Sequence, residues 1–495
     1  MANSFYRALA VVGSVAAWTM LLPLRGHEPA QPSEESWRPS QQTALGAVDQ
    51  YADQIRQWNR AVWEFAELGL QEHRSSRLLA DALEQAGFQV KRGVSGMPTA
   101  FVASYGSGRP IIGLLAEYDA LPGMSQEVAP HRQPIRDGAP GHACGHSALG
   151  AAAVGAAIAI KEALEKHHIP GTIRLYGTPA EETVIGKVYM ALDGQFDDLD
   201  ICLHWHPSDK NAAWAASSKA LVSAKFTFEG LPAHASVSPE AGRSALDAVE
   251  LMNVGANFMR EHVREDARIH YVITDGGGQP NVVPARATVW YYVRADKHQD
   301  VEYYFEWLRD IAQGAALMTR TRVSVQIDTD CHEIVPNRPL AELLTRNLRR
   351  VGPPVFTEEE RTFARRLQEP LEREFGWQFP EPLETTVREE QESELSKGST
   401  DVGDISWRVP TGGLRTACFV AGAPGHSWQN VATIASSIGE KGMLYAAKTL
   451  AVSALDLFED PRWIAAARED FKQRMEGRTY RSLIPPGQRP PQTIR

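Results

Sequence analysis

The sequence predicts an α/β fold with a mainly parallel sheet, interrupted by an inserted ferredoxin-like α+β domain. Two observations lead to this prediction. Short apolar segments alternate with segments of helical spacing up to about residue 215 and again after about residue 336, whereas the region between them has the order β-α-β-β-α-β. With 495 residues, the chain is also too long for one ordinary compact core, so two domains are expected.

The first α/β part contains both kinds of segment in alternation. Helical spacing of apolar residues predicts helices over 49–68, 71–86 and the Ala-rich 147–167. Apolar runs predict strands over 99–105, 111–116, 171–177 and 200–204. The run 111–116 is almost continuously apolar, which is typical of a strand buried on both faces of a parallel sheet.

The middle of the chain shows a different pattern. Strands are expected over 220–229, 267–274, 287–294 and 322–328, with helices over 244–263 and 298–318. This order predicts a ferredoxin-like domain over 216–334 that is inserted between two α/β parts, 43–215 and 335–475. Residues 351–397 are charged and contain several prolines, so they are expected to form a long excursion with some helix.

Both ends of the chain have their own composition. Arg7 precedes an apolar run up to Leu24, and this pattern indicates an export signal or an uncleaved membrane anchor. A Pro-, Ser- and Glu-rich tether follows, so residues 1–42 are expected to lie outside the fold. The protein would then be periplasmic or secreted, and a membrane would be contacted only through this anchor. The Pro- and Arg-rich residues 476–495 are expected to be disordered.

The overall composition excludes several classes of function. Hydrophobic residues make up 43% and charged residues 23% of the chain, as in a soluble globular protein. The net charge is -10 and no stripe of Lys or Arg is present, so a nucleic-acid partner is not expected. Four cysteines are too few for a disulfide framework in a chain of this length. Cys144 stands between His142 and His146, which favours metal binding or catalysis for this cysteine.

Five short segments carry residues that suit a metal site, and each ends or interrupts an apolar strand or opens a helix. They are 116–122, 142–146, 178–183, 203–207 and 423–428. Cys144 and His146 open the Ala-rich helix, and a thiolate and an imidazole are good ligands for zinc and similar ions. Glu181 and Glu182 would repel each other unless a cation were near. Because their side chains point differently, one could bind a metal while the other faces the reacting water.

Histidines complete the set. His204 and His206 are two residues apart on a predicted strand, so they share one face and either could be a ligand, while His426 follows a predicted strand over 416–421. Each segment alone has an ordinary structural explanation, such as an acidic turn or a buried thiol. Together they supply ligands for two divalent ions and leave a free carboxylate, as metal-assisted hydrolysis requires.

The sequence resembles the dinuclear metallo-aminoacylase and carboxypeptidase G superfamily, in the branch with a Cys-Gly-His metal motif, and most of all aminobenzoyl-glutamate utilization proteins and related dipeptidases. The likeness runs from about Asp49 to Leu457 and is carried by the segments 117–122, 141–146, 230–235, 277–284 and 398–403. It implies hydrolysis of a small N-acyl amino acid or dipeptide-like amide. Glu117 replaces the first residue of the usual His-x-Asp motif, which agrees with a site where Cys144 and His146 take over coordination.

The resemblance also implies roles for single residues. Cys144 would bridge two divalent ions, zinc or manganese with cobalt as a further option, and the other ligands would be His146, Glu182, His426 and His206, with His204 as the rival of His206. Glu181 would be the general base that accepts a proton from the attacking water, and Asp119 would orient a ligand. The two α/β parts would form the catalytic domain, and the inserted domain would be its lid and dimerisation domain. There His234 would reach the active site of a partner subunit in a homodimer, and Asn281 would hold the substrate carboxylate.

Two other functions are compatible with parts of the sequence. Cys144 could be the nucleophile of a cysteine hydrolase, but this leaves Glu181, Glu182 and His426 without a role, and such an enzyme would survive a chelator. A non-catalytic binding protein on the same fold would be expected to lack these residues. The exact amide substrate is left open, and Arg243 and Arg294 fit either a carboxylate-binding or a structural role.

Overall fold

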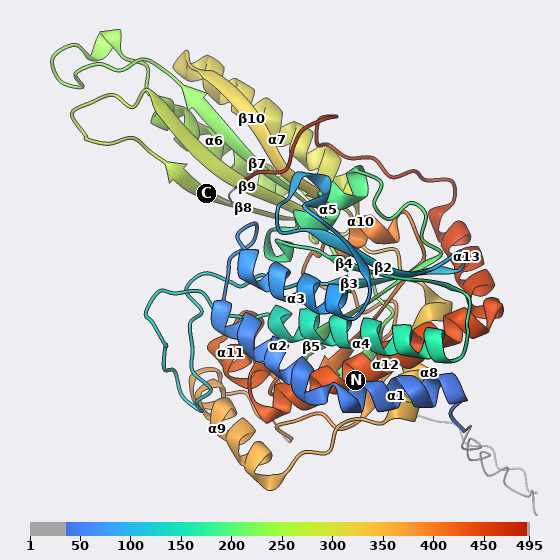
Figure 1. Cartoon of the computed structure of the whole chain (residues 1–495). Helices are drawn as coiled ribbons and strands as arrows, with labels where there is room; N and C mark the ends of the chain where they lie inside the picture. Colours follow the sequence, from blue (N-terminus) through green and yellow to red (C-terminus); the bar gives the residue numbers. More distant parts are fainter. Residues whose placement is uncertain (1–35, 380, 493–495) are drawn as a thin grey trace, which may run out of the picture. The chain divides into compact units, whose positions relative to one another are not determined.

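The computed structural model describes residues 36–379 and 381–492 (Figure 1). The expected export signal or anchor falls on residues 1–35 and lies outside the described residues. Helix α1 (Pro39–Gln50) begins four residues before the domain start expected at residue 43. Within the described residues one helix, α4 (His146–Lys166), has the length and apolar composition to cross a membrane, and most of it is buried inside the protein.

A large mixed sheet runs through the α/β part of the chain. Its strands lie in the order β1-β2-β4-β3-β5-β12-β6-β11. Their bounds are β1 (Gln89–Arg92), β2 (Phe101–Ser107), β3 (Ile111–Ala116), β4 (Gly171–Gly177), β5 (Ile201–Ser208), β6 (Asn211–Trp214), β11 (Val387–Arg388) and β12 (Thr411–Ala417). The central strands β4, β3, β5 and β12 are parallel, and β11 is parallel to β6, whereas the pairs β1–β2, β2–β4 and β12–β6 are antiparallel. The predicted mainly parallel α/β sheet is confirmed.

Helices cover both faces of this sheet. One face packs against α4 and, with it, α1, α2 (Ala52–Phe65), α3 (His73–Gln85), α8 (Arg338–Val351) and α12 (Ser437–Glu459). The other face packs against the short helices α5 (Gly186–Leu192) and α10 (Val402–Ser406). Strand β3 shows the two-sided burial directly, because Leu114 faces the first layer and Leu115 the second. This sandwich places the carboxyl ends of the central strands at one edge.

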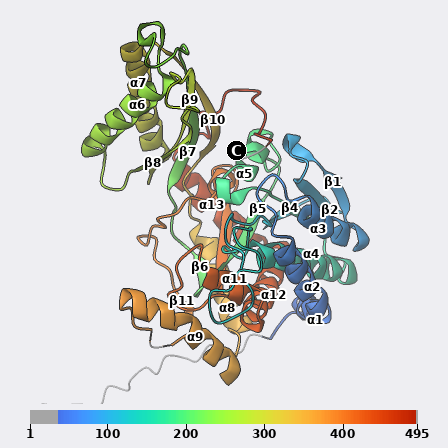
Figure 2. The ribbon, with the colours of Figure 1, turned by 90° about the vertical axis from the view of Figure 1, so that its left-hand side faces the viewer.

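A separate four-stranded antiparallel sheet has the order β10-β7-β9-β8. It consists of β7 (Ala220–Glu229), β8 (Arg268–Asp275), β9 (Arg286–Ala295) and β10 (Arg322–Cys331). Helices α6 (Ala245–Met259) and α7 (His298–Thr319) pack on one of its faces (Figure 2). The order β-α-β-β-α-β is the one that the sequence predicted for the inserted ferredoxin-like domain.

Two segments differ from the expectations, and a third contains the helix that was expected there. The strand before His426 is Thr411–Ala417, several residues earlier than the apolar run 416–421 suggested. Residues 351–397 contain α9 (Glu358–Phe375), which begins with a capping box between Thr357 and Glu360, and strand β11. The tail from residue 476 to 492 was expected to be disordered, but it packs against the fold. Its Ile484 is only 5% exposed and belongs to an apolar core. The remaining helices are α11 (Trp428–Ile434) and α13 (Pro461–Met475).

Candidate metal centre

Side chains from five separate segments converge at the carboxyl edge of the large sheet. Glu117 and Asp119 follow β3, Glu181 and Glu182 form a short 3-10 turn after β4, and His206 lies near the end of β5. Cys144 and His146 lie at the start of α4, and His426 precedes α11. The parallel strand order brings these ends together, since consecutive strand ends meet at one edge.

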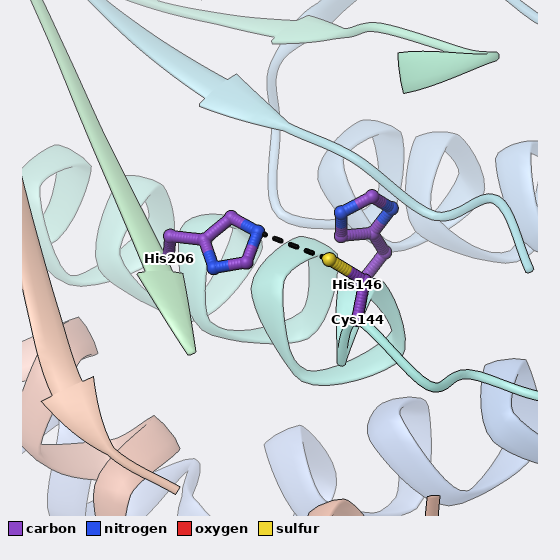
Figure 3. Close-up of side chains that lie close together, drawn as sticks. All are labelled: Cys144, His146 and His206. Carbon is purple, nitrogen blue, oxygen red and sulfur yellow. Dashed lines mark hydrogen bonds between the residues drawn. The ribbon is translucent and has the colours of Figure 1, made fainter. Parts of the chain in front are cut away.

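The first group of potential ligands consists of Cys144, His146 and His206, whose ligand atoms all lie within 4.8 Å of one another (Figure 3). Sγ of Cys144 lies 3.5 Å from Nε2 of His206. The other ring nitrogen of His206, Nδ1, lies 2.7 Å from the carbonyl oxygen of Pro207. When Nδ1 carries the proton and donates it to this carbonyl, Nε2 is unprotonated. The lone pair of Nε2 then faces Sγ of Cys144.

A second group shares Cys144 with the first. Its members are Cys144, Glu182 and His426, and their ligand atoms again lie within 4.8 Å of one another. Nε2 of His426 lies 3.2 Å from Oε2 of Glu182. Cys144 therefore belongs to both groups.

Asp119 and Glu117 contact the two nitrogens of His146 from opposite sides. Oδ1 of Asp119 lies 2.8 Å from Nδ1 of His146, and Oε2 of Glu117 lies 3.3 Å from its Nε2. Glu181 also approaches this ring, with Oε2 at 3.8 Å from Nε2. Glu117, His146 and Glu181 therefore form a third close group of acidic and imidazole atoms.

The residues fit a pair of divalent cations. Among the described residues, the buried atoms Glu117 Oε2, His146 Nε2 and Glu182 Oε1 have no hydrogen-bond partner. Buried polar atoms without partners are costly and uncommon in native folds, and a cation would satisfy them. A thiolate, imidazoles and a carboxylate are the ligand types that zinc and similar ions accept.

The charges in this pocket shift the pKa values of its members. Burial raises the pKa of the Cys144 thiol, but His206 and His146 outweigh it and hold this pKa well below its ordinary value. Burial, together with Glu117 and Asp401, raises the pKa of Glu181 well above its ordinary value. Burial raises the pKa of Glu182 to about 7, with Cys144 acting in the same direction. The pocket thus concentrates negative groups that a bound cation would stabilise.

A buried lysine balances part of this negative charge. Lys187 is 0% exposed, and its Nζ lies 2.8 Å from Oε1 of Glu117 and 2.7 Å from Oδ1 of Asp401. The other carboxylate oxygen of Asp401 accepts a hydrogen bond from the Lys187 backbone N–H at 2.8 Å. The ammonium compensates Glu117 in the third group, which distinguishes that group from the two that share Cys144. No sequence pattern pointed to Lys187, and Asp401 stood out only as part of the motif 398–403.

The two histidines of β5 have different surroundings. His206 faces Cys144, whereas the His204 ring lies over Gly413 of β12 and packs against Trp214 with 5.0 Å between ring centroids. Burial lowers the pKa of His204 to about 3, with His206 contributing. His204 therefore belongs to neither ligand group.

His142 has a structural position. Its Nε2 lies 3.0 Å from the carbonyl oxygen of Val62, and the ring is completely buried. Burial, with a contribution from His146, lowers its pKa to about 4. A neutral histidine held by the backbone of α2 is not available as an acid-base partner of Cys144 near neutral pH.

His234 and Asn281 lie next to each other on exposed loops of the inserted domain. The backbone N–H of Ala235 donates to the carbonyl oxygen of Asn281 at 2.9 Å, and His234 forms a β-bridge with Val282. The N–H groups of Ser236 and Val237 donate to Nδ1 of His234, each at 3.2 Å. Within the described part of a single chain, neither side chain hydrogen-bonds to the groups around Cys144.

Arg294 of β9 connects the inserted domain to the segment that carries Asp401. Its Nη1 donates to Oγ of Ser399 at 2.9 Å, two residues before Asp401. Burial lowers the pKa of Arg294, while Tyr292, Cys331 and Glu181 act in the opposite direction. Among the described residues, the buried Nε of Arg294 has no hydrogen-bond partner, so this guanidinium retains a free donor.

Comparisons with known proteins agree on one family. Residues 113–487 match the family described as peptidase family M20/M25/M40. The chain is 41% identical over 448 residues to a subunit of the p-aminobenzoyl-glutamate hydrolase of Escherichia coli (strain K12), covering 86% of this chain and 93% of that protein. It is 28% identical over 467 residues to the Xaa-Arg dipeptidase of Mus musculus, covering 91% and 96%.

Solved structures show the same fold. An aminobenzoyl-glutamate utilization protein from Klebsiella pneumoniae superposes with a TM-score of 0.58 at 20% identity, covering 83% of this chain and 97% of that chain. A dinuclear metal-binding peptidase of the M20 family from Bacillus subtilis superposes with a TM-score of 0.53 at 18% identity, covering 83% and 99%.

Proposed function

This chain belongs to peptidase family M20/M25/M40, and on that premise we propose that it is a two-metal amidohydrolase for a small N-acyl amino acid or dipeptide of the aminobenzoyl-glutamate type. One observation carries the proposal. Cys144 is shared by two groups of ligand atoms, while Glu181 lies beside them and belongs to neither. Two cation positions next to a free carboxylate are what metal-assisted hydrolysis of an amide needs.

The residues divide between the two positions. Cys144, His146 and His206 would hold one divalent ion, and Cys144, Glu182 and His426 would hold the other. Zinc, manganese and cobalt all accept these ligand types. When bound, such ions polarise the amide carbonyl and lower the pKa of a coordinated water from 15.7 to about 7.

Glu181 is the residue that moves the proton. Its carboxyl is buried, and burial with Glu117 and Asp401 raises its pKa, so it accepts a proton more readily than an ordinary glutamate. Glu181 takes a proton from the attacking water and returns it to the nitrogen of the leaving amine, which departs as a neutral amine. Asp119 supports this step indirectly, because its two oxygens hold the His146 ring and the backbone N–H of Glu182.

Arg294 suits the carboxylate of the substrate. The two relatives are named for p-aminobenzoyl-glutamate and for Xaa-Arg dipeptides, both of which carry a free carboxylate beside the scissile amide. The guanidinium of Arg294 contacts Ser399, two residues before Asp401, and keeps a buried Nε–H without a partner among the described residues. A carboxylate would accept this donor in a charge-assisted hydrogen bond.

We further propose that two chains associate through the inserted domain. Strand β8 is an edge strand, and its residues Tyr271, Val272 and Ile273 are exposed. On the adjoining helix α6, Phe258 is 71% exposed. An apolar edge strand without a partner favours pairing with a second strand. In such a homodimer His234 would serve the partner's site as an oxyanion donor, and Asn281 beside it would hold the substrate carboxylate.

The association is tested by light scattering on a size-exclusion column. Phe258→Glu should convert a dimer to a monomer, and Tyr303→Glu, which changes a similarly exposed aromatic residue on α7, should not. A wild-type monomer at micromolar concentration would contradict the proposal.

The N-terminal sequence supports a proposal for the location of the enzyme. We propose export to the periplasm or beyond, supported by Arg7 and the apolar run that follows it. Fusion of residues 1–42 to a reporter that is active only outside the cytoplasm tests this, and a silent reporter would contradict it.

The activity is tested with a panel of aminobenzoyl-glutamate, N-acyl amino acids and dipeptides. Purified protein is stripped with a chelator and reconstituted with zinc, manganese or cobalt, and the released amine is quantified by chromatography. Turnover that disappears with the chelator and returns with the ion supports the proposal. Turnover that survives the chelator but is lost when Cys144 is alkylated would favour a cysteine nucleophile instead.

A further inference from the structure

The turn that carries Glu181 and Glu182 has an unfavourable backbone. Ala180 has φ 56° and Val184 has φ 50°, so both ends of this 3-10 turn lie in the left-handed region. This region is uncommon for residues other than glycine, and for a β-branched residue such as Val184 it is a genuine outlier. Such conformations persist only where surrounding contacts hold them, and they occur often at functional sites.

Two buried carboxyl groups hold this turn by its backbone. Oδ2 of Asp119 accepts the N–H of Glu182 at 2.9 Å, and Oε1 of Glu72 accepts the N–H of Ala180 at 2.8 Å. Asp119 follows β3 at the site, but Glu72 is 108 residues away in sequence from Ala180 and belongs to no ligand group. Glu72 is also 0% exposed, a burial that is rare for a glutamate.

Glu72 does not cap the helix at whose start it lies. It occupies the N-cap position of α3, but its side chain makes no capping hydrogen bond there. The first N–H groups of α3 are instead accepted by Glu67, whose carboxylate takes those of Arg74 at 3.0 Å and Ser75 at 2.9 Å. The capping of α3 and the support of the 180–184 turn are therefore divided between two glutamates five residues apart.

We propose that Glu72 is a positioning residue for the hydrolytic reaction, which fixes the Ala180 amide and thereby the direction of the Glu181 carboxylate. This inference rests on the proposed role of Glu181 as general base. Burial, together with the charge of Asp119, raises the pKa of Glu72 to about 8, which favours the neutral carboxyl. A neutral carboxyl and a carboxamide can offer the same accepting oxygen, and the two are nearly equal in size. Glutamine should therefore replace Glu72 and alanine should not.

The test compares Glu72→Gln, Glu72→Ala and the matched control Glu67→Ala, which removes the carboxylate that caps the same helix. We expect Glu72→Ala to lower kcat by about 10²-fold with little change in KM, because a small misplacement of a catalytic group has effects of this order. Glu72→Gln should restore most of kcat, and Glu67→Ala should lower thermal stability while kcat stays near that of the wild type. Metal content should be unchanged in all three variants.

A second readout does not depend on activity. Hydrogen exchange followed by mass spectrometry should show faster exchange in the peptide that spans 178–186 for Glu72→Ala, but not for Glu72→Gln or Glu67→Ala. If Glu72→Ala does not fold, Glu72→Asp takes its place with the same expectation, since the side chain is one methylene shorter. Wild-type kcat and unchanged exchange in the Glu72 variant that is used, Ala or Asp, would overturn the inference. A loss of kcat in Glu67→Ala as large as that in the Glu72 variant would overturn it too. Full activity of Glu181→Ala would overturn the general-base role, whereas the exchange result would still show whether Glu72 holds the turn.

Discussion

The carboxylate of Asp119 lies 2.8 Å from Nδ1 of His146, and both side chains are completely buried. Burial alone would raise the pKa of Asp119, but the charge of His146 and their hydrogen bond lower it below the ordinary value. The pair fixes the orientation of an imidazole that belongs to the first ligand group. The second oxygen of Asp119 also holds the backbone of Glu182, so one carboxylate aligns both groups around Cys144.

Glu181 and Glu182 should separate catalysis from metal binding. Glu181→Ala should lower kcat by about 10²–10⁴-fold or more, because the reaction loses its general base. Its metal content, measured by plasma mass spectrometry, should stay nearly intact. The matched variant Glu182→Ala should lose metal as well as activity, since Glu182 belongs to a ligand group. A fall of metal content in Glu181→Ala would show that the roles of base and ligand are wrongly assigned.

His206 and His204 provide a second matched pair. His206→Ala should weaken binding of one metal ion, because its Nε2 faces Sγ of Cys144. His204→Ala should keep the metal and lose stability instead, since the ring fills space between Trp214 and the backbone of Gly413. Metal titration and urea unfolding of both variants check the prediction. Loss of metal in the His204 variant alone would make it the ligand.

Lys187 should be essential for folding stability. Lys187→Met leaves Glu117 and Asp401 as buried carboxylates without their cation, and breaking a buried ion pair in this way costs about 3–5 kcal/mol. The triple variant that adds Glu117→Gln and Asp401→Asn should recover part of this loss. Urea unfolding of the metal-free proteins measures both effects. A change below about 1 kcal/mol for Lys187→Met would contradict the buried ion pair.

His298 should make stability depend on pH. Burial lowers its pKa, but Asp330, at 2.8 Å from Nε2, outweighs this and raises the pKa above the ordinary 6.5. Because the folded pKa is the higher one, the stabilisation is fully present below the unfolded pKa and is lost as pH rises through the folded pKa. His298→Gln should therefore destabilise the protein more at about pH 6 than at about pH 9. Equal losses of unfolding free energy at both pH values would contradict a charged His298.

The sequence by itself determined the order of the domains and the location of the chemistry. Apolar runs, helical spacing and turn residues are local patterns, so they predicted β3, β4, α4 and the inserted β-α-β-β-α-β unit from the chain alone. The rule that active sites lie at the carboxyl ends of parallel strands then placed Asp119, Cys144 and Glu181 at one edge.

Only the tertiary structure decided which of these residues meet and what supports them. Residues two apart on a strand share a face, so the periodicity that described β5 could not distinguish His204 from His206. That distinction depends on β12, more than 200 residues later, whose Gly413 accommodates the His204 ring. Lys187 and Glu72 had no local signal for the same reason. Their partners are distant in sequence. Which buried polar groups pair with each other therefore depends on the packing of the whole fold and not on any short segment.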